Sequence, residues 1–464
     1  MKRTLNLFIL LLFSTVLLAQ GKAKYVFYFI GDGMGVDQVN GTEMYLAEKE
    51  GRIGYESLRF TQFPVASISH TYSKENSVTD SSAAGTALAT GEKTYNGAIG
   101  VGFDKERLMT VAERAKREGR NVGVITSVSV DHATPAAFYA HQPQRGMYHE
   151  IAKDLPKANF DFYGGSGFLK PEGKEGEPSV FELFDSSGYK VVRGLSAYKE
   201  AKNASKLILI QEEGQSKNSL PYAIDRQSGD LSLKDITASA IDHLSKDKKK
   251  GFFLMVEGGK IDWACHDNDA ATAFNEVIDM DEAIGEALEF YKKHPKETLI
   301  VVTADHETGG MALGTGRYEL NLAALQHQKV SAGELSKKIS KLRQEKENKV
   351  SWEDMKELLA ENMGFWKENK LTWAQERKLR DEFEVSFVQK KKSFEESMYT
   401  KSEPMAARAK EVLNQIAMIS WASGSHSANF VPVFAIGAGA ELFMGKLDNI
   451  EIPRRIAKAA GYKW

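Results

Sequence analysis

The sequence predicts an α/β fold in which a parallel-rich central sheet lies between two layers of helices. Short, continuously apolar runs indicate strands that are buried on both faces. Segments with helical spacing separate these runs, so strand and helix alternate along the chain. Several runs end at an acidic residue, and ligands gather at the carboxyl ends of strands in such sheets.

The strand candidates are residues 25–30, 252–256 and 299–302, each followed by a polar or glycine-rich segment. Residues 108–118 and 271–294 are examples of the helices expected between strands. This alternation favours a three-layer sandwich of helices, sheet and helices.

The composition is that of a soluble globular chain without a strong overall charge. The 464 residues are 42% hydrophobic and 27% charged, which is ordinary for a folded protein. The formal net charge is only -2, so no global field attracts nucleic acid or an anionic membrane. We therefore expect no nucleic-acid binding, and an anionic substrate must be attracted by a local site.

The N-terminus has the layout of a secretory signal peptide. Met1-Lys2-Arg3 precedes an apolar stretch over residues 5–18, and the small residue Ala19 follows. A retained anchor is the alternative, but a spanning helix needs ~20 apolar residues and this stretch is shorter. We predict that residues 1–19 are removed and that the protein is exported to the periplasm or the extracellular space. No second long apolar stretch follows, so no membrane span is expected after removal.

Residues 20–464 are predicted to form a single domain with a helical insertion over about 318–415. Within it, residues 334–415 are dense in Lys and Glu, and we interpret these charges as solvated helix faces rather than a binding patch. Two residue pairs resemble capping boxes: Ser351 with Asp354, and Thr372 with Gln375. We hypothesise that the insertion shapes substrate entry or the contacts of a homodimer, and the oligomeric state stays open.

Cys265 is the single cysteine, which excludes an intramolecular disulfide. Stability must therefore come from the core and from bound metal. We interpret Cys265 as a small core residue, with a ligand role beside His266 as the alternative.

Three acidic residues follow the predicted strands: Asp32, Glu257 and Asp305. The carboxyl ends of parallel strands meet at one edge of a sheet, and buried carboxylates repel one another unless a positive group lies between them. A metal cluster resolves this conflict, so the sequence predicts one at this edge.

Three histidines lie in segments that are compatible with metal binding. Asp262 and His266 are four residues apart, so on one helical turn they point the same way, which is a common spacing for zinc ligands. A surface hydrogen bond between them is the alternative. His306 follows Asp305 at a strand end, where a cap and a solvated imidazole are the alternative. His426 lies in a small-residue turn, and taken alone it would be a loop histidine.

Ser81 precedes a run of small, helix-compatible residues, so we expect it at a helix N-terminus. Free amides and the helix dipole at such a terminus favour a phosphate or an alkoxide. For an isolated Asp80-Ser81 pair, a simple N-cap is the alternative.

Several motifs, taken together and in order, closely resemble alkaline phosphatase. They are Gly31-Asp32-Gly33-Met34-Gly35; Asp80-Ser81 with Thr90-Gly91-Glu92-Lys93-Thr94-Tyr95-Asn96-Gly97; Glu257-Gly258-Gly259 before Asp262; and Thr303-Ala304-Asp305-His306-Glu307-Thr308-Gly309-Gly310. The resemblance spans about residues 24–313 and resumes near Trp421, which leaves the insertion outside it.

The resemblance implies two zinc ions and one magnesium ion as cofactors. One zinc would be bound by Asp262, His266 and His426. The second would be bound by Asp32, Asp305 and His306, with Ser81 as its remaining ligand. The third metal, usually magnesium, would take Asp32, Thr134 and Glu257. The chemistry of the donors agrees, because imidazoles fall at the two zinc sites while the third site has oxygen donors alone.

The resemblance also implies that Arg145 clamps the phosphate, since its planar fork can hold two oxygens. His132 stands where some members have aspartate, and Trp263 stands where others have lysine or histidine. With Asp80, these two residues are expected to surround the metals without binding them. The two departures leave the identity of the third metal open.

The implied activity is hydrolysis of small phosphate monoesters through a phosphoserine at Ser81. Phosphodiesterases and sulfatases are the nearest rival enzymes. A sulfatase needs a Cys/Ser-x-Pro-x-Arg run, whereas Ala83 and Gly85 occupy the Pro and Arg places here. Arg145 and Glu257 argue against a diesterase, because both favour a doubly charged terminal phosphate. An envelope protein that keeps the metal site without turnover is the alternative from another class.

Overall fold

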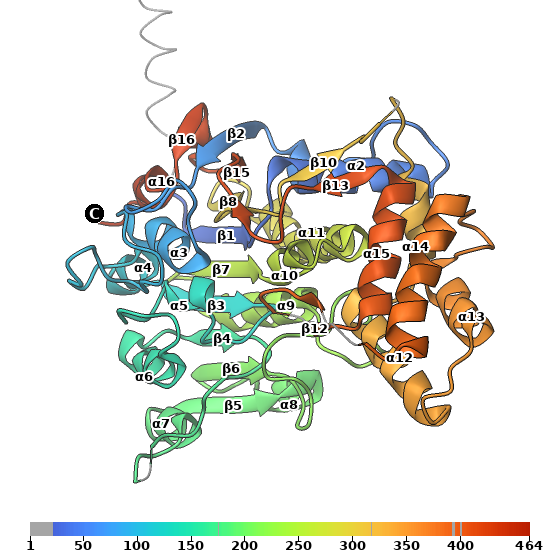
Figure 1. The fold of residues 1–464 in the computed structure, drawn as a ribbon. Coiled ribbons are helices and arrows are strands. Elements are labelled where there is room, and N and C mark those ends of the chain that lie inside the picture. The colour runs from blue at the N-terminus through green and yellow to red at the C-terminus, as the bar shows by residue number, and fades with distance from the viewer. Residues whose placement is uncertain (1–21, 175, 317, 392–394, 400) are drawn as a thin grey trace, which may run out of the picture.

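A sheet of ten strands forms the centre of the molecule (Figure 1). The computed structural model describes residues 22–464 except 175, 317, 392–394 and 400, so the predicted signal peptide lies outside the described residues. From one edge to the other the strands are β16 (Lys446–Asp448), β2 (Val65–His70), β15 (Val431–Gly437), β8 (Thr298–Ala304), β1 (Tyr25–Gly31), β7 (Phe252–Gly258), β3 (Asn121–Thr126), β4 (Phe162–Gly164), β6 (Lys206–Ile210) and β5 (Tyr189–Arg193). β15 runs antiparallel to both neighbours, and the other neighbouring pairs are parallel, which confirms the predicted parallel-rich sheet.

The three predicted strands are β1, β7 and β8, and they lie side by side in the middle of the sheet. Every residue of these strands is buried, which explains their continuous apolar runs. Along β1, Val26 and Tyr28 face one hydrophobic core while Phe27 and Phe29 face the other. The sheet therefore separates two cores, and each needs its own layer of helices.

Helices cover both faces of the sheet, as Figure 1 shows. One core includes residues of α3 (Ser81–Thr90), α4 (Val111–Arg117), α5 (Ala133–Ala136), α6 (Tyr148–Ala158), α7 (Val180–Ser186) and α16 (Glu451–Ala460). The other includes residues of α2 (Val36–Lys49), α8 (Gly194–Ala201), α9 (Leu233–Leu244), α10 (Lys260–His266) and α11 (Ala270–Lys293). Among the helices of the described residues, none is long and apolar enough to cross a membrane.

Capping residues set where the predicted helices begin. We expected a helix over residues 108–118, but α4 starts at Val111 because Thr110 and Glu113 form a capping box. The helix expected over residues 271–294 is α11, whose N-cap Asp269 accepts a hydrogen bond from the backbone N–H of Thr272.

Cys265 is fully buried in the core between the sheet and α11, as expected for a small core residue. The Nε2 atom of Gln38 lies 3.9 Å from its Sγ atom. Burial raises the pKa of the Cys265 thiol well above its usual value, which disfavours the reactive thiolate.

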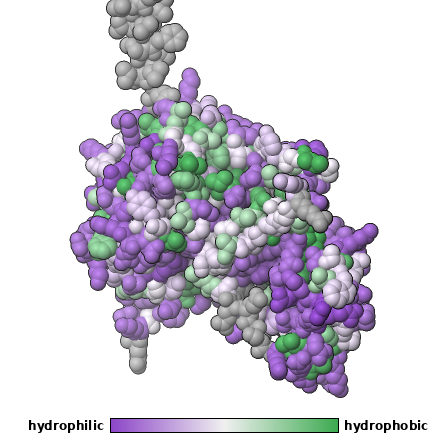
Figure 2. Space-filling model, turned by 45° about the horizontal axis from the view of Figure 1, so that its top comes forward, coloured by the Kyte–Doolittle hydropathy of each residue, from purple (hydrophilic) through white to green (hydrophobic). Residues whose placement is uncertain are grey.

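Four helices form a separate layer beside the carboxyl ends of the strands (Figure 1, orange to red). They are α12 (Ala332–Glu345), α13 (Trp352–Met363), α14 (Trp373–Phe383) and α15 (Pro404–Ala417). They pack around a third hydrophobic core, which also includes residues of α2 and α11, and both predicted capping boxes are present. The outer surface of this segment is largely hydrophilic in Figure 2, which agrees with solvated charges.

One buried ion pair joins the first and last of these helices. Arg343 on α12 donates hydrogen bonds to the carboxylate of Glu403, the N-cap of α15, and both side chains are at least nine-tenths buried. Arg343 Nη1 also lies 3.2 Å from the carbonyl oxygen of Ser386, and its guanidinium stacks on Phe387 at 3.4 Å. The ion pair therefore holds α12 against the start of α15.

Arg343→Met is expected to lower the free energy of unfolding by ~3–5 kcal/mol, because it leaves the Glu403 carboxylate buried without its partner. Urea unfolding at neutral pH measures the change. Lys341→Met on the same helix is the control: its ion pair with Glu345 is exposed, so stability should hardly change. Equal stability of the two variants would contradict the assigned role of Arg343.

Candidate active site

Three carboxylates converge at the carboxyl ends of adjacent strands. Asp32 follows β1, Glu257 lies near the end of β7, and Asp305 follows β8. All three side chains are fully buried. The sheet order β8-β1-β7 therefore brings together the three acidic residues that the sequence placed at strand ends.

A second group assembles around the short helix α10. Its Asp262 and His266 point the same way, with 3.3 Å between Asp262 Oδ2 and His266 Nε2. His426 Nε2 lies 3.1 Å from His266 Nε2 and 3.6 Å from Asp262 Oδ1. His426 belongs to β14 (His426–Ser427), which pairs antiparallel with β9 (Glu307–Thr308). This pairing brings a histidine from the C-terminal part of the chain to the acidic residues.

His306 links the remaining predicted ligands. Its Nε2 atom lies 3.3 Å from Asp32 Oδ1, 3.4 Å from Asp305 Oδ2 and 3.2 Å from Ser81 Oγ. The rings of His306 and His426 stack with 3.6 Å between centroids. The two predicted zinc sites are thus neighbours.

Oxygen donors surround the place predicted for the third metal. Thr134 Oγ1 lies 3.4 Å from Asp32 Oδ2 and 3.4 Å from Asp305 Oδ2. A carboxylate oxygen of Glu257 accepts a short hydrogen bond from Thr126 Oγ1. His132 also offers a ring nitrogen within 4.8 Å of Asp32 and Glu257 oxygens, so a nitrogen donor lies beside this set as well.

Ser81 is the first residue of α3, as the small-residue run predicted. Asp80 is the N-cap, because its Oδ1 atom accepts from the backbone N–H of Ala83 at 2.9 Å. Asp80 therefore caps the helix, while the hydroxyl of Ser81 lies in the site. A side chain at Gly85 would lie 3.3 Å from the Cα atom of Thr134, so the small residues let α3 approach the segment that carries this predicted ligand.

Arg145 lies beside the start of α3. Its Nη1 atom is 3.2 Å from Asp80 Oδ2, and its Nη2 atom is 3.5 Å from the hydroxyl oxygen of Tyr399. Burial alone would lower the pKa of Arg145, but Tyr399 and Asp80 outweigh it and raise the pKa. The guanidinium is therefore charged and held from two sides.

The buried negative charges of the cluster favour the binding of a cation. Burial, followed by repulsion between carboxylates, raises the pKa of Asp32 and Asp305 well above the usual value. Burial likewise raises the pKa of Glu257 to about 7. Within the described residues, Asp32 Oδ1, Asp262 Oδ2 and Glu257 Oε1 accept no hydrogen bond. These buried acceptors fit divalent metal ions, which take such lone pairs and cancel the repulsion.

Hydrogen bonds behind the histidines direct their Nε2 atoms inward. His266 Nδ1 lies 2.7 Å from the carbonyl oxygen of Gly424, and His426 Nδ1 lies 2.8 Å from that of Thr79. A carbonyl can only accept, so each Nδ1 carries the proton and each Nε2 keeps its lone pair for a metal. Thr308 Oγ1 donates to Asp262 Oδ1 at 2.6 Å, which fixes that carboxylate in the same way. Sequence reasoning missed these supporting residues.

Tyr399 is a further residue that sequence reasoning missed. Its ring stacks on Trp263 with 4.4 Å between centroids and meets the edges of His132 and His266. Burial lowers the pKa of His132 to about 3, with Arg145 adding to the effect, so this imidazole is neutral at pH 7. Two of the three residues predicted to surround the metals, His132 and Trp263, thus pack against one aromatic ring that comes from the helical segment.

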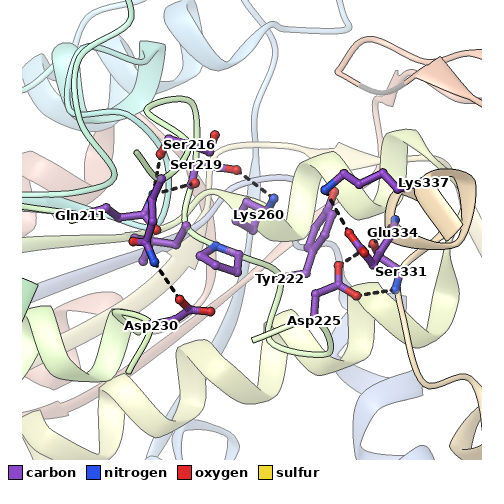
Figure 3. Close-up of a pocket in the computed structure, with 14 residues that line it drawn as sticks. Gln211, Ser216, Ser219, Tyr222, Asp225, Asp230, Lys260, Ser331, Glu334 and Lys337 are labelled. Atoms are coloured by element: carbon purple, nitrogen blue, oxygen red, sulfur yellow. Dashed lines mark hydrogen bonds and ion pairs between the residues drawn. The ribbon is translucent and has the colours of Figure 1, made fainter. Parts of the chain in front are cut away.

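Figure 3 shows residues that line a separate cavity of about 350 Å³. Lys260 lines it, with its Nζ atom 3.0 Å from Ser219 Oγ, 3.4 Å from the Tyr222 ring centroid and 4.9 Å from that of Trp263. Burial lowers the pKa of Lys260 to about 8. None of the predicted site residues belongs to the described lining of this cavity. Lys260 therefore contacts the Trp263 ring from the cavity side.

Comparison with known proteins gives one consistent family. The family model described as alkaline phosphatase matches residues 23–162 and 178–462. The match includes the helical insertion, which corrects our expectation that the resemblance leaves it out. Alkaline phosphatase 3 of Bacillus subtilis strain 168 is 34% identical over 461 residues, which cover 96% of this chain and 90% of that protein.

Solved structures agree with the sequence match. A cold-active alkaline phosphatase from a psychrophile, Shewanella sp., superposes with a TM-score of 0.78 at 28% identity, covering 94% of this chain and 99% of that one. A TAB5 alkaline phosphatase mutant with Mg bound gives a TM-score of 0.68 at 26% identity, covering 96% and 99% of the two chains.

We predict that Zn²⁺ stabilises the protein after exhaustive chelation, because a cation relieves the repulsion between buried carboxylates. At a metal concentration about 100 times the Kd, the free energy of unfolding should rise by roughly 3 kcal/mol. Calorimetric unfolding with and without Zn²⁺ measures this change.

The Asp262→Asn variant should gain less stability from Zn²⁺, because one anionic ligand is lost. His149→Ala is the matched control, because His149 belongs to a separate group with Glu150 and Glu177 that could also hold a metal ion. This variant should gain as much stability from Zn²⁺ as wild type. The same gain in Asp262→Asn and wild type would show that the metal binds elsewhere.

Proposed function

Because the chain belongs to the alkaline phosphatase family and is a phosphomonoesterase, we propose that it forms a phosphoserine at Ser81 in a site with two zinc ions and one magnesium ion. One observation carries the proposal. Ser81 Oγ lies 3.2 Å from His306 Nε2, inside a buried cluster of carboxylates and imidazoles. A serine hydroxyl in that position can react without a histidine base, because a metal lowers its pKa.

The donor sets support the proposed cofactors. Asp262, His266 and His426 supply a carboxylate and two imidazoles, which suit one zinc ion. The second zinc would take Asp32, Asp305 and His306 beside Ser81. Asp32, Thr134 and Glu257 offer oxygen, which suits magnesium, and Mg is bound in the related TAB5 mutant. Bound metals would lower the pKa of the Ser81 hydroxyl and offset the charge of the substrate.

In the proposed first step, Ser81 Oγ attacks the phosphorus atom of a monoester in line with the leaving oxygen. The new O–P bond forms as the bond to the alcohol oxygen breaks, and the alcohol leaves opposite Ser81 and is protonated. The guanidinium of Arg145 holds two non-bridging phosphate oxygens. The N-terminus of α3 favours negative charge at Ser81, before and after the transfer.

In the second step, water attacks the phosphoserine from the side that the alcohol has left. The bond between phosphorus and Ser81 Oγ breaks, inorganic phosphate is released, and the serine regains its proton. Two successive in-line displacements give overall retention at phosphorus. Asp80 and Tyr399 contact Arg145 from two sides, so the guanidinium can keep its orientation through both steps.

Two further proposals concern the surroundings of the enzyme. The layout of residues 1–19 supports export to the periplasm or the extracellular space. Small phosphomonoesters are the proposed substrates, because the side chains of the cluster are buried rather than spread over a broad surface.

A comparison of esters tests the proposed function. Zinc- and magnesium-loaded protein should hydrolyse p-nitrophenyl phosphate faster than its bis-ester, and Ser81→Ala should lower kcat for the monoester at least about a thousandfold. Ser82→Ala is the control, since Ser82 Oγ is buried beside the nucleophile but makes no hydrogen bond within the described residues. Preference for the diester would contradict the assignment, and equal rates for wild type and Ser81→Ala would favour the binding protein without turnover.

Arg145→Gln should lower kcat/KM for p-nitrophenyl phosphate by about 10²-fold, the loss expected when one charged donor to the transition state is removed. Tyr399→Phe should weaken competitive inhibition by inorganic phosphate by only a few-fold, because its hydroxyl orients Arg145 through one long hydrogen bond. Steady-state kinetics on both variants measures these effects. If kcat/KM for p-nitrophenyl phosphate fell further in Tyr399→Phe than in Arg145→Gln, the proposed order of importance of the two residues would be reversed.

A further inference from the structure

A cavity of about 370 Å³ lies beside the predicted metal cluster and shares His266 with it as a wall. Other parts of its lining come from Asp267 and Asn268 after α10, from Gly424 before β14, from Ser402 just before α15, and from Lys410 in the middle of α15. The helical segment therefore supplies one side of a cavity whose other side is a predicted zinc ligand.

Lys410 is a cation in the lining of this cavity, and Asp267 in the same lining is not within ion-pair distance of it. The exposed fraction of Lys410 is 9%, and no hydrogen bond or ion pair joins it to any residue that the structure describes. Nearby cations of the segment differ, because Arg408 contacts Glu411 and Lys378 contacts Glu411 at 3.0 Å. Lys410 also lines an adjoining cavity of about 310 Å³. Burial of an unpaired ammonium is costly.

Ser402 adds a second polar group without a partner. Its exposed fraction is 2%, and its Oγ atom makes no hydrogen bond among the described residues. A buried hydroxyl in this state costs stability. An ammonium and a hydroxyl that both lack partners in one cavity fit a ligand with a negatively charged, hydrogen-bond-accepting group.

The reaction geometry indicates which part of a substrate reaches this cavity. In-line transfer puts the leaving oxygen opposite Ser81, which contacts His306. His426 stacks on His306 and lies 3.1 Å from His266, so the histidines lead from the nucleophile toward the cavity wall. An alcohol that leaves on this side passes His266.

We propose that this cavity binds the alcohol part of the substrate, and that Lys410 and Ser402 select alcohols that carry an anionic group such as a carboxylate. The proposal rests on the proposed function and names the substrate class of the same site. Lys410 binds the anionic group by charge, and Ser402 donates a hydrogen bond to it.

The test compares phenyl phosphate with 4-carboxyphenyl phosphate on metal-loaded, full-length protein. In wild type, kcat/KM should be higher for the carboxylate ester. In Lys410→Met, the ratio of the two kcat/KM values should fall about tenfold, the loss expected for one charge-assisted hydrogen bond. The ratio also cancels changes that affect both esters equally. Lys341→Met removes an exposed charge of the same helical segment and should leave the ratio unchanged.

Ser402→Ala gives an independent measurement. The ratio should fall by a few-fold, while thermal stability should not fall, because the lost hydroxyl has no partner in the free protein. A purely structural role of Ser402 would instead lower stability and leave the ratio unchanged, and that result counts against the proposal.

Failure of this proposal and failure of the proposed function can be told apart. Hydrolysis of both esters with the same ratio in wild type and Lys410→Met would overturn the alcohol subsite alone. If wild type hydrolyses neither ester, the proposed function is wrong, and calorimetry with phenylphosphonate and 4-carboxyphenylphosphonate then decides the subsite. Equal affinities for the two phosphonates would overturn it, and tighter binding of the carboxylate in wild type but not in Lys410→Met would support it.

Discussion

Repulsion among the carboxylates of Asp32, Glu257, Asp262 and Asp305 is the constraint on which the rest of the structure depends. All four are fully buried, and three of them stand at the ends of adjacent parallel strands. Such a cluster is stable only when cations lie within it or protons neutralise it. The architecture supports the first solution, because Nδ1 hydrogen bonds to backbone carbonyls leave the Nε2 lone pairs of two histidines facing the carboxylates.

The elements around the cluster place reactive groups beside these carboxylates. Helix α3 brings a hydroxyl against His306, and its N-cap Asp80 holds Arg145 beside that hydroxyl. The proposed nucleophile and the proposed phosphate clamp are thus connected through two neighbouring residues, Asp80 and Ser81, at the start of one helix.

Much of the fold could be predicted from the sequence because its strongest signals are local. The fully buried strands β1, β7 and β8 have unbroken apolar runs, and each carries its acidic residue at or just beyond that run. The ligand set was harder: Asp262 and His266 show a spacing, but His426 has no local signal, and the family resemblance alone connected it to them. The structure places these residues together, while their metal ligation stays a proposal.

Other residues could not be predicted because tertiary packing alone gives them a role. Tyr399 and Lys410 lie in a segment whose sequence reads as solvated helices, and no spacing connects them with Ser81. Thr308 donates a hydrogen bond to Asp262, and the pairing of β9 with β14 puts His426 beside Thr308, from more than one hundred positions along the chain. A sequence pattern can indicate a polar residue at such a position, but it does not name the partner.

The place of β15 in the sheet has a consequence for the order in which the chain folds. β15 comes near the C-terminus, yet it lies between β2 and β8, so the early strand β2 has no native neighbour toward the sheet centre until β15 has been synthesised. His426 lies in β14, shortly before β15 along the chain. The sheet is therefore completed, and the last predicted ligand becomes available, only when the C-terminal part of the chain has been made. A nascent chain cannot assemble the full predicted metal site before most of the protein has left the ribosome.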